Sequence, residues 1–246
     1  MQGFRKRLRA SEPMLGTFLK IPSTQPAEIL GTLGFDFVVI DEEHAPLNPE
    51  TTDAILLACR AHHMGGLVRV RHPSDILRVL DCGADGVLVP HVTSAEVARK
   101  IVALARYDGV RGLSPTTRAG GFGGVPVSEH MTEQDTGCAV IAMIEDVDAL
   151  DRINEIVATE GLDAIFIGRA DLGASMGVPP GDPGLDCAVT KLLTAARSAT
   201  LPALVLAADP AEAGRLRSLG ATGFLSGSDQ GFLRVAAANA RSLLLK

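Results

Sequence analysis

In the segment Phe35–His44, an apolar run is followed by three acids and a histidine. Its first part is apolar and β-branched, which is typical of a strand buried on both faces. Its last part contains Asp41 and His44, a pair in which the carboxylate could fix the imidazole tautomer and the imidazole could act as a general base. Charged groups at the exit of a buried strand indicate the catalytic end of a parallel α/β protein.

Other polar residues stand at the ends of further apolar segments: Arg69 and Arg71, His91, Glu145 and Asp171. Two carboxylates suit a hard divalent cation that keeps positions open for substrate. An arginine that faces a barrel interior is costly unless it holds an anion. The sequence therefore predicts an anion site beside a cation site, with His91 as a weaker candidate.

Each of these residues also has a structural interpretation. Glu145 could be an acid favoured by a helix dipole, and Asp171 could cap the helix that follows it. Arg69 could pair with a barrel carboxylate. The remaining histidines are expected to be solvated surface groups: His62, His63, His72 and His130.

Eight strand–helix units account for the positions of these residues. The predicted strands are 14–20, 35–41, 67–71, 86–89, 138–145, 163–168, 201–207 and 223–226. The count and the length predict a single-domain (β/α)8 TIM barrel over residues 1–246. A doubly wound open sheet is the alternative, but Lys20–Ser23 is not the glycine-rich fingerprint expected after its first strand. The glycine-rich segment 107–137 is predicted to be a functional loop or lid.

Composition narrows the functional classes. The net charge is −6, so nothing indicates a basic surface for nucleic acid. No apolar run approaches the roughly 18 residues that a membrane span needs. The four cysteines are far apart and are predicted to be reduced core thiols, which favours a cytoplasmic location.

Several separate motifs then agree with one known family. They are Gly16–Lys20, Gly34–Pro46 with its Asp-x-Glu-His-Ala-Pro ending, Val68–Val70, Asp81–Pro90, Ile144–Glu145 and Ile167–Leu172. Together, and in order over roughly residues 14 to 230, they resemble the class II pyruvate aldolases of the HpcH/HpaI family.

This resemblance implies a site. Glu145 and Asp171 would ligate a divalent cation such as Mg, Mn or Co, which would chelate pyruvate. Arg69 would stabilise the enolate oxygen. His44, oriented by Asp41, would act as the base through a metal-bound water.

The resemblance also implies the surroundings of that site. The backbone around Ala170 and Asp171 would hold the pyruvate carboxylate, and Met143 stands where some relatives place a glutamine near the substrate. Asp81 matches an acid that approaches a neighbouring subunit's site. The family forms homo-hexamers, as trimers of dimers, with an exchanged C-terminal helix.

The chain departs from the family pattern at Glu42, Met143 and Arg169, and at Arg71, which is a rival to Arg69 for the cation role. These departures bear on aldehyde preference more than on metal binding. The expected function is the reversible, metal-dependent cleavage of a 4-hydroxy-2-oxo acid to pyruvate and an aldehyde, with oxaloacetate decarboxylation as a side activity. The alternatives are a barrel isomerase or phosphate-handling enzyme that uses the glycine-rich loops 119–124 and 226–229, and a catalytically silent binding protein.

Overall fold

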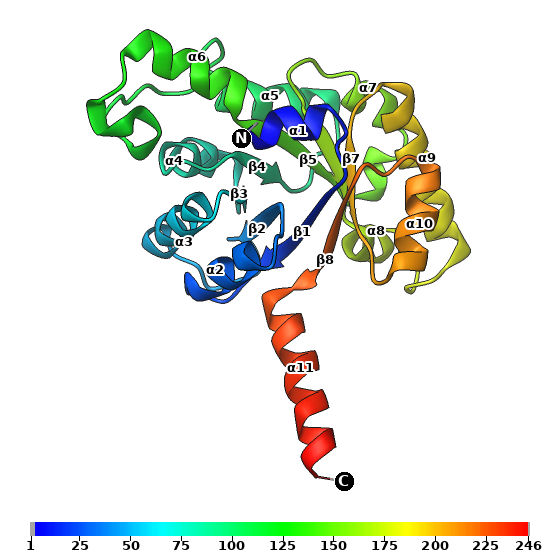
Figure 1. Cartoon of the computed structure of the whole chain (residues 1–246). Coiled ribbons are helices and arrows are strands. Elements are labelled where there is room, and N and C mark those ends of the chain that lie inside the picture. The colour runs from blue at the N-terminus through cyan, green and yellow to red at the C-terminus, as the bar shows by residue number, and fades with distance from the viewer. Residues whose placement is uncertain (1–2, 246) are drawn as a thin grey trace.

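A computed structural model describes residues 3–245, in which eight parallel strands close into a barrel in the order β1 to β8 (Figure 1). The strands are β1 Met14–Leu19, β2 Phe37–Asp41, β3 Gly65–Arg69, β4 Gly86–Val89, β5 Ala139–Ile144, β6 Ala164–Ile167, β7 Ala203–Leu206 and β8 Gly223–Ser228. The predicted (β/α)8 fold is confirmed. A single domain over residues 1–246 stays a prediction, since residues 1, 2 and 246 lie outside the described part of the chain.

Helices surround the barrel and close one of its ends. They are α1 Phe4–Arg9, α2 Gln25–Thr32, α3 Pro49–Ala61, α4 Ile76–Asp81, α5 Ala95–Ala105, α6 Val127–Gly137, α7 Ile153–Val157, α8 Arg169–Met176, α9 Pro183–Ser198, α10 Pro210–Leu219 and α11 Asp229–Leu244, with short 3₁₀ helices η1 Pro73–Asp75, η2 Arg118–Gly123 and η3 Val147–Ala149. The side chains of Asn48 and Ser94 cap α3 and α5 by accepting the N–H groups of Thr51 and Val97. These caps satisfy donors that a helix start leaves free.

A repeated three-residue motif joins the strands in pairs. A glycine with positive φ and one further residue precede an Asp or Thr that leads into each even-numbered strand: Gly34 and Asp36, Gly83 and Asp85, Gly161 and Asp163, Gly220 and Thr222. Each Asp or Thr side chain accepts the backbone N–H of the preceding strand, from Leu15, Gly66, Val140 and Ala203 respectively. The backbone N–H of the same Asp or Thr donates back to the carbonyl of that partner at 2.9 Å in all four cases. This reciprocal bonding fixes the relative height of the strands in each pair.

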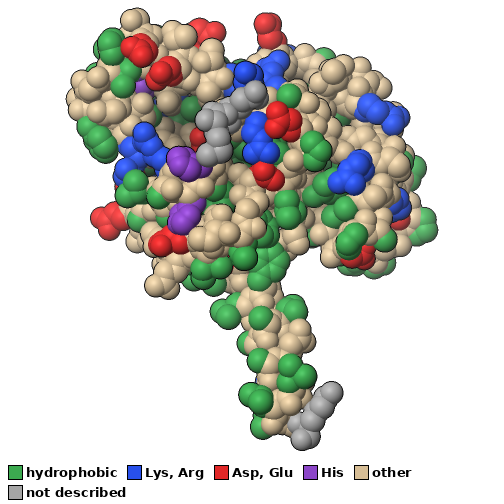
Figure 2. All heavy atoms as spheres, in the orientation of Figure 1, with side chains coloured by type: hydrophobic (Ala, Val, Ile, Leu, Met, Phe, Trp, Pro, Cys, Tyr) green, Lys and Arg blue, Asp and Glu red, His purple; other side chains and the backbone are tan. Residues whose placement is uncertain are grey.

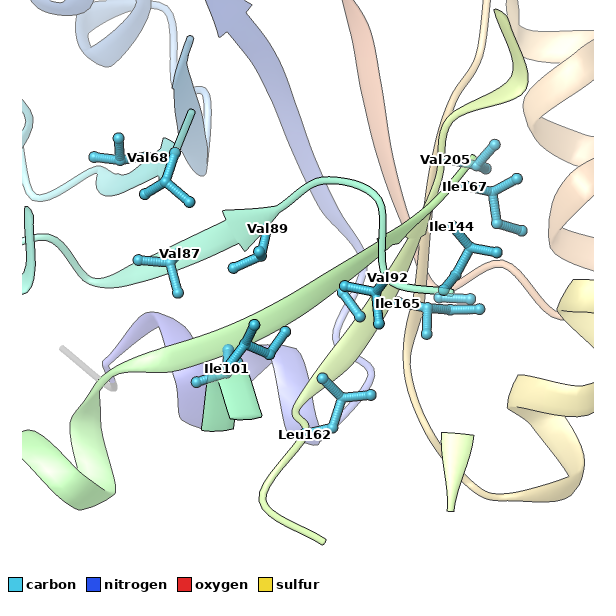
Figure 3. Close-up of a cluster of buried hydrophobic side chains, with 14 of the residues drawn as sticks. Val68, Val87, Val89, Val92, Ile101, Ile144, Leu162, Ile165, Ile167 and Val205 are labelled. Atoms are coloured by element: carbon cyan, nitrogen blue, oxygen red, sulfur yellow. The ribbon is translucent and has the colours of Figure 1, made fainter. Parts of the chain in front are cut away.

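The apolar core has two layers because side chains alternate along each strand. In β4, Leu88 faces the barrel interior, while Val87 and Val89 pack outward against the helices (Figure 3). Helix α1 closes the N-terminal end of the barrel, and its Phe4 ring lies 5.3 Å from that of Phe37. With this end plugged, the opposite end is left for the polar strand exits.

The segment 107–137 is neither structureless nor a lid over this barrel's own mouth. It contains η2 and α6, and α6 leads directly into the start of β5 beside α1, at the plugged end (Figure 1). His130, predicted to be solvated, is fully buried. Its Nε2 lies 2.8 Å from the Tyr107 hydroxyl and its Nδ1 lies 3.2 Å from the Ala119 carbonyl. A buried polar network therefore fixes a segment that composition alone suggested was loose.

Helix α11 extends away from the barrel (Figure 1). Figure 2 shows apolar side chains along this projecting helix. Four apolar residues of the helix are more than half exposed: Leu233, Val235, Leu243 and Leu244. Such a row of exposed apolar residues needs a covering surface that this chain does not give it.

Two smaller expectations have different outcomes. Cys59 and Cys138 are buried, as predicted, but Cys187 is exposed and Cys82 is half-buried. Both sit on the helical shell, where the outward positions of an amphipathic helix meet water. Within residues 3–245, no helix is long and apolar enough to cross a membrane.

Asp163 is the most heavily bonded acid of the repeated motif and is fully buried. Its carboxylate accepts Arg5 Nε at 2.8 Å, Arg9 Nη1 at 3.1 Å, Arg106 Nη2 at 3.1 Å and the Val140 N–H at 2.9 Å. Three guanidinium groups from two elements thus depend on one buried carboxylate.

We expect Asp163→Asn to lower the free energy of unfolding by about 3 kcal/mol, because it leaves buried guanidinium groups without their counter-charge. Asp36→Asn is the matched control, since Asp36 has the same place in the motif but pairs with the half-buried Arg7 alone. Its loss should be about 1 kcal/mol. Urea denaturation followed by circular dichroism measures both, and equal losses would contradict the argument.

Candidate active site

A buried ion pair anchors the open end of the barrel. Asp41 ends β2 and Arg69 ends β3, directly opposite in the parallel register. Arg69 donates two hydrogen bonds to the Asp41 carboxylate, from Nε at 2.9 Å and from Nη2 at 2.7 Å. Lys20, which follows β1, places its Nζ 3.2 Å from Asp41 Oδ2. Burial alone would raise the pKa of Asp41, but the hydrogen bonds and charge of Arg69 lower it below its ordinary value.

Arg69 and not Arg71 faces the mouth. The Arg69 guanidinium lies 5.0 Å from the centre of the Phe18 ring, and its Nη1 lies 3.3 Å from Glu43 Oε2. Arg71 is turned to the neighbouring loop, where it donates to the carbonyl oxygens of Glu42 and Leu47. Only Arg69 therefore stands where its charge can act on a molecule in the barrel mouth.

Glu145 is a buried acid whose cationic neighbour is the His91 imidazole, with Nδ1 3.5 Å from Glu145 Oε1. It follows β5 and accepts the backbone N–H of His91 at 3.0 Å. Burial raises the pKa of Glu145 to about 7, and the negative charges of Asp171 and Glu43 add to that rise against the opposing effect of His91. A Cβ at Gly168 would come within 2.9 Å of Glu145 Oε2, so the chain between β6 and α8 passes this close to Glu145 because residue 168 is glycine.

Asp171 lies in the first turn of α8 and lines the cavity at the open end of the barrel. Ala170 precedes it, at the helix N-terminus where backbone N–H groups have no partner within the helix. The structure thus brings the two predicted cation ligands and the predicted carboxylate-binding backbone to one place.

The Asp41 carboxylate contacts the backbone of His44 and not its imidazole, so the predicted pairing with the ring stays a prediction. Asp41 Oδ1 accepts the backbone N–H of His44 at 3.1 Å, and the rest of the carboxylate is taken by Arg69 and Lys20. The His44 side chain is half-exposed, and its Nε2 lies 3.7 Å from Glu43 Oε2. The acid three residues earlier in the sequence is therefore not the acid nearest to the ring.

His91 is more closely involved than the sequence indicated. It has a positive φ of 57°, and its Nδ1 lies 3.0 Å from Asp146 Oδ2. Burial alone would lower the pKa of His91, but the hydrogen bond to Asp146 and the charges of Glu145, Asp146 and Glu43 raise it. Backbone strain in a non-glycine residue is common at functional sites.

A cavity of about 560 Å³ lies at the open end of the barrel. Its lining includes Phe18, Lys20, His44, Arg69, Met143 and Asp171. Two larger cavities, of about 980 and 820 Å³, lie at the plugged end around Arg5 and Phe4. Asp81 is not at this mouth, because it ends α4 and accepts Arg111 Nη2 at 3.0 Å.

Sequence reasoning missed Lys20, Glu43 and Gly168 as site residues. Lys20 and Glu43 could have been found from the sequence, since both lie at strand exits next to residues that were selected. Gly168 could not, because its role is to leave room for Met143 and Glu145, and this is visible only in the structure.

Comparison with protein-family models matches residues 14–236 to HpcH/HpaI aldolase/citrate lyase. The chain belongs to this family. It is therefore an enzyme of a lyase family, which confirms the resemblance seen in its motifs.

Individual relatives agree. A pyruvate aldolase of Rhizobium etli is 37% identical over 88% of this chain and 87% of its own length. A 5-keto-4-deoxy-D-glucarate aldolase of Klebsiella pneumoniae is 34% identical over 95% of this chain and 93% of its own length. The crystal structure of an HpcH/HpaI aldolase/citrate lyase family protein from Burkholderia cenocepacia superposes with a TM-score of 0.91 at 31% identity, and covers 98% of each chain.

The donors at the mouth of this family member fit a hard divalent cation. Glu145 and Asp171 offer carboxylate oxygens, and the raised pKa of Glu145 reflects a buried negative charge that a cation would compensate. Among residues 3–245, no three His, Cys, Asp or Glu side chains come together as a complete metal cage. Two carboxylates with substrate and water oxygens are a usual arrangement for magnesium.

The raised pKa of Glu145 predicts a pH dependence in metal-free protein. Between its ordinary pKa of 4.5 and about 7 in the fold, the folded state holds more protons than the unfolded state, so stability falls as pH rises through this window. Glu145→Gln stays neutral and should lose this part of the slope. Melting temperatures of chelator-treated wild type and variant from pH 5 to 8 measure the difference, and identical slopes would show that Glu145 is already ionised.

Proposed function

We propose that this enzyme is a class II aldolase that reversibly cleaves a 4-hydroxy-2-oxo acid to pyruvate and an aldehyde. One observation carries the proposal: His44, Arg69 and Asp171, which come from three different strand exits, line one cavity. Glu145 is linked to Arg69 through contacts of His91 and Glu43. The names of the relatives, pyruvate aldolase and 5-keto-4-deoxy-D-glucarate aldolase, support it.

Arg69 would stabilise the charge that cleavage creates. When the bond between C3 and C4 breaks, its electron pair passes to the keto oxygen of the pyruvate half as an enolate. The Arg69 guanidinium is held in place by Asp41 before the reaction begins. Fixed donors of this kind typically contribute about 3 kcal/mol to the transition state.

His44 would move the proton. Its neutral imidazole would accept the proton of the C4 hydroxyl during cleavage and deliver it to C3 of the enolate, which gives pyruvate. Without an aldehyde, the same imidazole would take a proton from the methyl group of pyruvate and return one from solvent. Its half-exposed ring lines the mouth cavity, within reach of solvent and substrate.

The N-terminus of α8 would hold the pyruvate carboxylate. The backbone N–H groups around Ala170 and Asp171 have no partner within the helix and lie at its positive end. Met143, with Phe18 and Phe166, lines the apolar side of the cavity, where a methyl or methylene group fits. This arrangement orients the keto acid with its reactive carbon between Arg69 and His44.

Glu145 and Asp171 would hold a divalent cation, with magnesium, manganese and cobalt as the candidates. Such a cation supplies Lewis-acid charge that neutralises the developing enolate. Loss of carbon dioxide from oxaloacetate leaves the same enolate, so this site would also act as an oxaloacetate decarboxylase.

The assembly we propose is a cytoplasmic homo-hexamer, a trimer of dimers, in which α11 packs on a neighbouring barrel. The exposed apolar row of α11 supports this exchange. Asp81, away from its own mouth, would approach a neighbouring subunit's site.

Deuterium exchange into the methyl group of pyruvate tests the chemistry without an aldehyde. We expect exchange that EDTA abolishes and that Mg²⁺ or Mn²⁺ restores. Arg69→Ala should slow the exchange roughly 100-fold or more, because it removes the fixed positive charge beside the enolate oxygen. Arg71→Ala is the matched control, because it removes the neighbouring arginine, which bonds only to loop carbonyls, and it should retain most of the rate.

The same assay separates the alternative functions. An isomerase or phosphate-handling barrel would not depend on the divalent cation for pyruvate exchange, and a silent binding protein would show no exchange above that of buffer. Exchange that persists after EDTA treatment, or an Arg71 variant slower than the Arg69 variant, would contradict the proposed site.

Light scattering after gel filtration tests the assembly. We expect Leu233→Asp with Val235→Asp to yield a smaller species than wild type, since the charges would be buried when α11 packs on a neighbour. Asn239→Asp adds a charge at an exposed polar position of the same helix and should leave the mass unchanged. Wild-type protein that elutes as a monomer would rule out the exchange.

A further inference from the structure

We infer that His91 is a positioning residue for the proposed cation site: its left-handed backbone turns its N–H group toward Glu145 and thereby sets the orientation of that acid. This inference rests on the proposed function, in which Glu145 is one of the two cation ligands. The His91 side chain is 61% exposed, so burial in the core does not account for its backbone conformation.

The segment Pro90–Val92, which follows directly on β4, forms a strap across the end of β5. The backbone N–H of Val92 donates to the Met143 carbonyl at 3.2 Å. The backbone N–H of His91 donates to Glu145 Oε1 at 3.0 Å. Two successive N–H groups of the strap therefore bind the main chain of β5 and the side chain of the acid that follows it.

The strap reaches both partners because His91 has a φ of 57°. Successive N–H groups that serve one neighbouring element need a turn conformation of this kind, since an extended chain turns them to opposite sides. A positive φ is costly for a residue with a Cβ. The conformation therefore persists only if other contacts of the residue compensate that cost.

The imidazole of His91 supplies these contacts. Its Nδ1 lies 3.0 Å from Asp146 Oδ2, and its Nε2 lies 3.7 Å from Glu43 Oε1. Asp146 is available for this role, because its side chain does not cap the short helix η3 that it precedes. The ring thus contacts acids that follow two different strands, and these contacts hold the backbone of residue 91 in place.

Glu145 is consequently held on two sides. Its Oε1 accepts the His91 N–H, and the His91 Nδ1 lies 3.5 Å from the same oxygen. On the other side the chain passes at Gly168, where a Cβ would come within 2.9 Å of Oε2. Within residues 3–245, both contacts from His91 are made to Oε1, which leaves Oε2 for a cation. Partners that orient a metal ligand in this way typically change metal affinity about 10- to 100-fold.

The affinity of chelator-treated protein for Mn²⁺ tests this role without catalysis. We expect His91→Val to weaken Mn²⁺ binding roughly 10- to 100-fold, because a β-branched residue rarely adopts a positive φ and its N–H would turn away from Glu145. His91→Gly should bind Mn²⁺ within about threefold of wild type, because glycine adopts this φ without steric cost. Electron paramagnetic resonance, which detects the free Mn²⁺ in solution, measures both.

His63→Val is the matched control. His63 has a φ of 54°, but it lies beside the cavity at the plugged end of the barrel. The substitution therefore imposes the same backbone cost far from the proposed cation site. It should lower the melting temperature about as much as His91→Val does and leave the Mn²⁺ affinity unchanged.

A double-mutant cycle tests the contribution of the ring. Asp146→Ala removes the anchor of the imidazole and also one negative charge near the cation site. The loss of charge acts in any background, whereas the loss of the anchor acts only where residue 91 carries a ring. We therefore expect Asp146→Ala to weaken Mn²⁺ binding more in the wild-type background than in the His91→Gly background.

Four results would contradict these expectations. Wild-type protein that binds Mn²⁺, together with His91→Val that binds it equally well, would overturn this inference alone. Equal losses in His91→Val and His91→Gly would overturn the role of the backbone. Equal effects of Asp146→Ala in both backgrounds would overturn the role of the ring as its anchor. Wild-type protein that binds no Mn²⁺ would overturn the cation site of the proposed function and this inference with it.

Discussion

The bidentate ion pair between Asp41 and Arg69 is the constraint on which the site depends. A guanidinium buried at a barrel mouth is stable only with a counter-charge held at the correct height. The parallel register sets Asp41 opposite Arg69, and the reciprocal bonds of the Gly-x-Asp motif fix strand heights at the other end of the barrel. A slip of one residue would turn both side chains out of the interior. The positive charge at the mouth is therefore a consequence of strand register as much as of residue identity.

Much of this could be predicted from the sequence because it follows from local pattern. Apolar runs of strand length and the residues at their exits depend only on alternation and on the direction of parallel strands. For this reason Asp41, Arg69, Glu145 and Asp171 could be selected in advance, and the structure brings them to one end of the barrel.

The features that the sequence could not supply are contacts between distant elements. The nearness of Asp41 and His44 in sequence suggested a pair, but Arg69 from the next strand takes the carboxylate first. The burial of His130 depends on Tyr107, some twenty residues away, and on a backbone carbonyl between them. The glycine content of segment 107–137 indicated mobility, whereas its anchoring comes from side chains elsewhere. Spacing along the chain does not decide which acceptor a donor finds first in space.

The two acids of the mouth, Asp41 and Glu145, differ in what compensates their charge. Burial acts on both in the same direction, toward a raised pKa. For Asp41 the adjacent guanidinium reverses the effect, and the pKa is lowered. For Glu145, the backbone and imidazole of His91 only partly offset burial and the negative charges of Asp171 and Glu43, and the pKa rises to about 7. Carboxylates whose environments push their pKa values apart have different roles in catalytic sites. The ionised Asp41 is committed to holding Arg69, which leaves Glu145 and Asp171 as the acids whose repulsion an added cation would relieve. A metal ion would therefore bind at the acids that no arginine already neutralises, and the number of acids at the mouth matters less.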